Sequence, residues 1–275
     1  MHMKKLPSLK AGACLFIGLF LLHALLGGNA LAQNGYETGF ETIVKLTADL
    51  QQAVDRQQRP EISPTPVLLE NLPIPYLQMH LVEATKGVRA VHVSKGFVDL
   101  LNFISHAKAI DAANHGFFIK SMARLAAESG DRGLPDLLAN SARNSWSFAV
   151  MNSQASHFNQ MAGGLIAIEM AHVNLRHYQK YAPQLADARN QVVALNRVLQ
   201  PGEWQEAVIA AVRLGLDCGL AVDGLKIFFE SIDKMPARPP WRACFLPDAA
   251  TGKEINRINR ELERLQKNAF MGFTQ

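Results

Sequence analysis

Cysteine is scarce in this chain: only three occur among 275 residues, and none belongs to a Cys-x-x-Cys or Cys/His ligand pattern. A zinc ribbon and a thioredoxin-like redox site are therefore excluded. The sequence also lacks the Gly-x-Ser-x-Gly turn that carries the nucleophile of many hydrolases. Repeats and low-complexity tracts are missing too. The 48% of residues that are apolar suffice for a sizeable core.

The chain also lacks a large excess of basic or of acidic residues. The formal net charge is +4, but Lys4, Lys5 and Lys10 lie in an N-terminal segment that contains no acid. Without these three lysines, 25 of the 28 basic residues remain against 24 acidic ones, spread along the chain. Because no basic stripe is present, nucleic acid is not expected as a partner.

Long apolar runs are confined to the N-terminus, where residues 11–28 are apolar except for His23. Lysines precede this run, and Ala30 and Ala32 follow it at the −3 and −1 positions of a cleavage site. The layout predicts a secretory signal peptide over residues 1–32. An uncleaved anchor is the alternative, because the run is just long enough to cross a bilayer. We expect a periplasmic or secreted protein that has no membrane span after cleavage.

Two cysteines, Cys218 and Cys244, remain in the chain after this cleavage. In an oxidising compartment such an even pair predicts one disulfide. Two buried thiols are the alternative.

Helical periodicity dominates the rest of the chain. It predicts an amphipathic helix over 37–57, a proline-rich linker over 60–75 and a strand over 88–94. Further helices are predicted at about 97–110, 112–128, 134–149, 155–181, 184–199, 203–220, 222–235 and 252–268. The expected fold is mainly α with a small β-sheet, of the α+β class.

The most informative stretch is residues 163–177, Gly-Gly-Leu-Ile-Ala-Ile-Glu-Met-Ala-His-Val-Asn-Leu-Arg-His. It resembles the active-site helix of the zinc endopeptidase family that includes HtpX, the CAAX prenyl proteases and several periplasmic proteases. Stretches within 91–101, 213–230 and 246–258 resemble further elements of that family. The resemblance implies a zincin-like fold with a helical insertion at about 103–158. It also implies a division into an N-terminal helix with linker (33–75) and a metallopeptidase-like domain (76–275).

The family motif is His-Glu-x-x-His, in which two histidines on one helix face bind zinc and the glutamate activates the bound water. By resemblance, Glu169 stands at the base position and His172 at the second ligand. Ile168 occupies the first ligand position, and Ala210 occupies that of the third ligand, a glutamate. Because catalytic zinc needs three protein ligands, we expect no cofactor.

Two residues are possible replacements for the missing ligands. Glu206 precedes Ala210 by one helical turn and can serve a displaced zinc site. His177 lies about 140° from His172 around a continuous helix, so it is expected to face elsewhere. The Glu-x-x-His pattern also occurs in di-iron bundles, but the second copy that such sites need is missing.

The resemblance therefore implies a catalytically inactive metallopeptidase homologue that binds a peptide or an envelope protein. Family proteases pair an extended substrate with an edge strand, and this pairing needs no metal. The corresponding residues here are Ala90, Val91, His92, Val93 and Ser94. The alternative is an active zinc metalloendopeptidase with atypical ligands, among them His172 and Glu206, with zinc as cofactor.

Export is predicted to remove residues 1–32, because small residues frame the cleavage site after the apolar run. Intact-mass measurement of protein from the cell envelope should give a chain that begins at Gln33. A mass that includes Met1 would indicate the uncleaved anchor.

Overall fold

The computed structural model describes residues 28–56, 65–81, 89–129, 134, 146–188, 190–248 and 250–272. Helices make up most of these residues, and three strands form one sheet. The α+β class expected from the sequence is therefore confirmed. No helix in the described ranges has both the length and the apolar character needed to cross a membrane.

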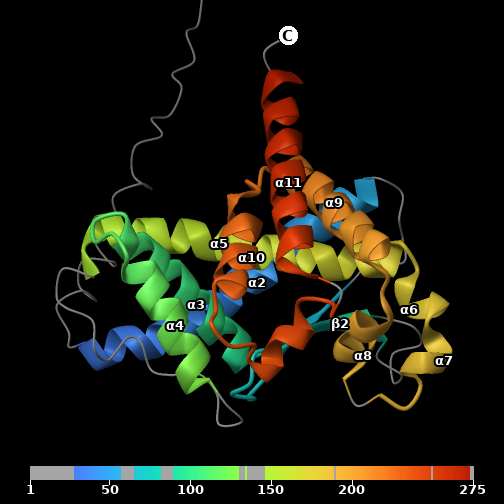
Figure 1. Ribbon diagram of the computed structural model, residues 1–275, viewed down its shortest axis with the longest axis horizontal. Coiled ribbons are helices and arrows are strands. Elements are labelled where there is room, and N and C mark those ends of the chain that lie inside the picture. The colour runs from blue at the N-terminus through green and yellow to red at the C-terminus, as the bar shows by residue number, and fades with distance from the viewer. Residues whose placement is uncertain are drawn as a thin grey trace, which may run out of the picture.

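The arrangement centres on one long helix. Helix α5 crosses the middle of the molecule, and the C-terminal helix α11 projects from the body (Figure 1). The strands are β1 (Val67–Glu70), β2 (Leu77–Leu81) and β3 (Arg89–Ser94). The helical elements are α2 (Gly28–Arg56), α3 (Lys95–Asp111), α4 (Phe117–Glu128), α5 (Phe148–Asn174), α6 (His177–Lys180), α7 (Ala182–Leu185), α8 (Gln191–Val198), α9 (Pro201–Asp217), α10 (Asp223–Asp233), the 3-10 helix η4 (Pro240–Cys244) and α11 (Gly252–Gly272).

Most predicted helices are present, but some boundaries differ. Helix α2 begins at Gly28, so the predicted cleavage point lies inside it, while residues 1–27 are outside the described ranges. The helix predicted at 155–181 is divided, because Arg176 adopts a left-handed φ of 60° between α5 and α6. The helix predicted at 134–149 falls largely on residues 135–145, which are also outside the described ranges.

The sheet corrects the position of the predicted edge strand. Its strand order is β1-β3-β2, with β1 parallel and β2 antiparallel to β3. Residues Ala90–Ser94 therefore belong to the central strand and have neighbours on both sides. The sequence pattern concealed the two outer strands, because Pro66, Pro73 and Pro75 stand outside them and made the whole stretch resemble a linker.

Small residues allow α10 to approach α5 closely. A Cβ atom on Gly164 would lie 2.5 Å from Leu225, and one on Gly224 would lie 2.4 Å from the backbone of Gln160. Helix α5 also packs against α2, α3 and α9. As a result, its C-terminal half lies at the centre of the hydrophobic core.

The predicted disulfide is not formed. Cys218 caps the C-terminus of α9, and its sulfur lies 3.6 Å from the carbonyl oxygen of Asp49 in α2. Cys244 lies in η4, where its sulfur is 4.0 Å from Nδ2 of Asn190. Sequence separation sets the length of the loop between two cysteines but does not bring their sulfurs into bonding geometry.

Alkylation of the unfolded protein without reductant should therefore modify both Cys218 and Cys244. In the folded protein Cys244 should react much more slowly, because burial raises the pKa of its thiol to about 12 and the thiolate is the reactive form. Mass spectrometry of the digested protein locates the adducts. A disulfide-linked peptide pair would contradict this arrangement.

Candidate functional site

The family-like motif lies in the most deeply buried part of α5. Ile168 and Glu169 are each 5% exposed, and His172 is 2% exposed. Their neighbours from residue 165 to 173 are also buried. Because no side of the helix faces water here, the two polar side chains need partners inside the protein.

The two positions at which the resemblance would place metal ligands belong to the core or pack against it. Ile168 belongs to the main hydrophobic cluster, and Ala210 of α9 packs against it. Neither side chain carries an atom that binds a metal. The family's ligand arrangement is therefore missing at these two points.

Glu169 links three elements of the fold. Its Oε2 accepts a hydrogen bond from the Tyr178 hydroxyl at 2.7 Å and one from the backbone N–H of Met79 at 3.2 Å. These donors belong to α6 and β2, respectively. Burial raises the pKa of Glu169 to about 7, although both hydrogen bonds oppose that rise. The residue at the base position thus joins α5 to its neighbours.

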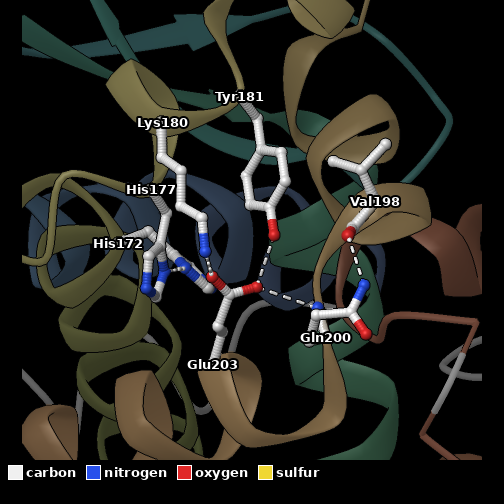
Figure 2. Close-up of polar contacts among 7 residues, drawn as sticks. All are labelled: His172, His177, Lys180, Tyr181, Val198, Gln200 and Glu203. Carbon is white, nitrogen blue, oxygen red and sulfur yellow. Dashed lines mark hydrogen bonds and ion pairs between the residues drawn. The ribbon is translucent and has the colours of Figure 1, made fainter.

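His177 lies beside His172, which corrects the expectation that it faces elsewhere. The Nδ1 atoms of the two rings are 2.8 Å apart (Figure 2). An angle of about 140° between the two side chains holds only on one continuous helix, whereas α5 ends at Asn174. The left-handed Arg176 redirects the chain, so that α6 begins with His177 against the His172 ring.

The contact between the two rings determines their protonation. Two Nδ1 atoms at this distance share one proton, so one imidazole donates and the other accepts. Burial lowers the pKa of His172 to about 3, and the neighbouring His177 contributes in the same direction. Burial also lowers the pKa of His177, against the opposing charges of Glu203 and Glu206. Both rings are therefore neutral at neutral pH.

Glu203 connects α9 to the last residue of α6 and to the residue that follows it. Its carboxylate accepts hydrogen bonds from the Lys180 ammonium, from the Tyr181 hydroxyl at 2.6 Å and from the Gln200 backbone at 2.9 Å (Figure 2). Burial acts to raise the pKa of Glu203, but these hydrogen bonds and the Lys180 charge lower it to about 2. The ionised carboxylate is thus engaged with protein donors.

Glu206, the proposed replacement ligand, is exposed on α9 and acts on His177 through its charge. In the described part of the chain, no group of three or more His, Cys, Asp or Glu residues could hold a metal. A metal bound by both Nδ1 atoms would have to displace the proton that the two imidazoles share. The positive charge of Lys180, which acts on His177, would also oppose a bound cation. The three donors that a catalytic zinc needs are therefore not gathered among the described residues.

Comparisons with known proteins add no match: no family profile, no curated protein and no solved structure resembles this chain significantly. The family resemblance rests on residues 163–177 and the shorter stretches that accompany them.

Several site residues were not predicted from the sequence. Met79 and Tyr178 give no recognisable signal, because their contacts with Glu169 depend on the end of α5 and on the path of β2. Glu203 does have a signal, since it follows Pro201 as the third residue of α9. Proline in the first turn and glutamate at the third position are typical of a helix start.

Glu169→Gln should remove the pH dependence that this buried carboxyl gives to stability. The pKa of Glu169 is raised in the folded state. Its contribution to the free energy of unfolding is therefore complete below the ordinary pKa of 4.5 and is lost as the pH rises through about 7. Glutamine keeps an acceptor oxygen for both donors and stays neutral. We expect the variant to exceed wild type by up to about 3 kcal/mol at about pH 8, and to match it near about pH 4.

Urea unfolding across this pH range measures the difference. The lowered pKa values of His172 and His177 act in the opposite direction, but both proteins retain these residues, so their effect cancels. Glu230→Gln is the matched control, because its carboxylate pairs with Lys234 on the surface of α10. A difference between Glu169→Gln and wild type that stays constant with pH would contradict the prediction.

Proposed function

We propose that this protein is a periplasmic or secreted metallopeptidase homologue that lacks catalysis and acts by binding peptides or proteins. The observation that carries the proposal is the engagement of Glu169 by Tyr178 and Met79. The zincin-like fold and the insertion at about 103–158 belong to the same proposal and rest on the sequence resemblance.

Catalysis in this family needs a carboxylate that takes a proton from a metal-bound water. In this chain Oε2 of Glu169 already accepts two hydrogen bonds from the protein. Ile168 supplies no ligand, and Nδ1 of His172 is bonded to His177. The residues that would hold the metal and activate the water therefore have other structural roles.

Binding is supported by the distribution of exposed apolar side chains. Eight large apolar side chains are exposed among the described residues, and four of them lie between positions 68 and 74. These four are Leu68, Leu69, Leu72 and Ile74, each more than 40% exposed. A concentration of exposed apolar groups on an outer strand and the turn after it is typical of a protein contact.

An active zinc metalloendopeptidase remains the alternative proposal. The observation in its favour is the approach of His172 and His177, with Glu206 as the third ligand. Zinc–nitrogen bonds of about 2.0–2.1 Å in tetrahedral geometry place two ligand nitrogens roughly 3.3 Å apart. The observed 2.8 Å is shorter and suits a hydrogen bond better.

The proposal predicts binding without cleavage. Fluorescein-labelled, reduced and carboxymethylated lactalbumin is a suitable probe because it stays unfolded. Fluorescence anisotropy should show that it binds, and electrophoresis should show no fragments. Glu169→Gln should change neither result, and elemental analysis should find far less than one zinc per chain.

Two results would decide against this proposal. Zinc near one per chain that is lost in His172→Ala but kept in His157→Ala would establish the alternative, as would cleavage that is lost in Glu169→Gln. His157 is the matched control because it lies on α5 outside the site. A wild-type protein that neither binds nor cleaves lactalbumin would refute the binding role.

A further inference from the structure

One end of the molecule carries exposed apolar side chains of its own, apart from those on β1. Phe148 and Met151, in the first turn of α5, are 82% and 37% exposed. Ile119, in the first turn of α4, is 61% exposed. A single exposed apolar side chain needs no explanation, but three that lie together form a candidate contact surface.

The packing beneath these side chains brings them to the same place. A small hydrophobic cluster, separate from the main core, joins the end of α3 to Val150 of α5, and Phe117 of α4 packs against it. Ile119 follows Phe117 by two residues. Phe148 precedes Val150 by two residues, and Met151 comes directly after it. These three exposed side chains, Phe148, Met151 and Ile119, are called the apolar end below.

Helix α2 runs in the same direction as α5. A Cβ atom on Gly39 of α2 would lie 3.2 Å from the ring of Phe158 in α5. Further along α2, the Gln51 amide donates to the carbonyl oxygen of Thr65, just before β1. Strand β2 of the same sheet is bonded to Glu169, further along α5. Figure 1 shows both helices running from the left of the molecule toward the right.

Because the two helices are aligned, α2 begins near the apolar end. From Gly39 back to Gly28 are 11 residues, and from Phe158 back to Phe148 are 10. At 1.5 Å per residue these stretches span about 16 and 15 Å. The first turns of α2 and α5 therefore lie at the same end of the molecule.

The sequence before α2 indicates what this end faces. The apolar run of residues 11–28 leads directly into α2. A signal peptide keeps the residue that follows it at a membrane surface until cleavage, and an anchor keeps it there permanently. Under both interpretations of the run, Gly28 belongs at a membrane surface, and the apolar end lies on the same side of the protein.

The charges at this end also suit a lipid surface. Lys120 is exposed in the first turn of α4, next to Ile119. Lys108, in the last turn of α3, has its ammonium 5.1 Å from the centre of the Phe118 ring. The nearby Asp111 carboxylate accepts the N–H of Phe118. Lysines beside exposed apolar side chains attract anionic headgroups, while the apolar groups enter the acyl boundary.

We infer that the apolar end is a membrane-contact surface, where Phe148, Met151 and Ile119 enter the interface of a lipid bilayer and Lys120 binds its anionic headgroups. This contact goes beyond the proposed peptide binding, because it uses residues other than those on β1. A bilayer fits this end better than a protein partner, because α2 begins here and the apolar run of the sequence leads into it.

Quenching of tryptophan fluorescence by brominated lipids tests the surface. Phe148→Trp places an indole at the apolar end. Leu69→Trp is the matched control, because Leu69 is also exposed but lies on β1. Wild type gives the background from the native tryptophans. With vesicles of brominated phosphatidylglycerol, the added fluorescence should be quenched strongly in Phe148→Trp and hardly at all in Leu69→Trp. The comparison holds with or without the apolar run, since both variants share the same N-terminus.

Vesicle sedimentation measures affinity for a chain that begins at Gln33. Phe148→Ser should bind phosphatidylglycerol vesicles about tenfold more weakly than wild type, because an aromatic ring is lost from the interface. Lys120→Gln should bind these vesicles about fivefold more weakly, but its affinity for phosphatidylcholine should not change. Leu69→Ser should bind like wild type. Circular dichroism checks that each variant is folded.

The outcomes separate this inference from the proposed function. An indole at position 148 that is not quenched, or is quenched no more than one at position 69, would overturn the membrane contact. If it is not quenched and Phe148→Ser loses the lactalbumin probe, the apolar end binds a protein instead. If it is quenched but wild type does not bind lactalbumin, the membrane contact stands and only the peptide-binding function is refuted.

Discussion

A helix that is packed on every side must satisfy each of its polar groups within the protein, and this constraint governs the structure around α5. Glu169 and His172 lie at the centre of the core, where water does not compete for their hydrogen bonds. Their partners come from β2 and α6, which places these two elements against α5. The same burial raises the pKa of the carboxyl and lowers that of the imidazole, so both side chains favour their neutral forms.

The path of the chain after α5 makes these contacts possible. The left-handed Arg176 ends the regular helix and turns α6 back toward the site, bringing His177 to His172 and Tyr178 to Glu169. Glu203 then joins α9 to Lys180 and Tyr181. Glu169 and His172 are therefore held by bonds that join α5 to α6 and β2. The concentration of exposed apolar side chains lies elsewhere, on β1 and the turn after it.

Periodicity in the sequence was enough to predict the helical class, the central strand and the boundaries of several helices, because those features follow from the local alternation of apolar and polar residues. It could not predict the break at Arg176, since a single left-handed residue has no periodic signature. The prolines around β1 and β2 obscured both outer strands, so nothing in the sequence opposed the edge position that the resemblance gave to Ala90–Ser94. Likewise, the spacing of Cys218 and Cys244 said nothing about their partners Asp49 and Asn190, which lie far away in the sequence.

The link made by Glu169 also bears on whether a metal site could be engineered near the end of α5. A mutation of Ile168 to histidine would add one possible ligand, but Glu169 would still be held by Met79 and Tyr178. Releasing it would leave a buried N–H and a buried hydroxyl without partners, at about 1–3 kcal/mol each. Any change that frees the Glu169 carboxylate would therefore first weaken the fold, so new acceptors for the Met79 N–H and the Tyr178 hydroxyl would have to be supplied before new ligands.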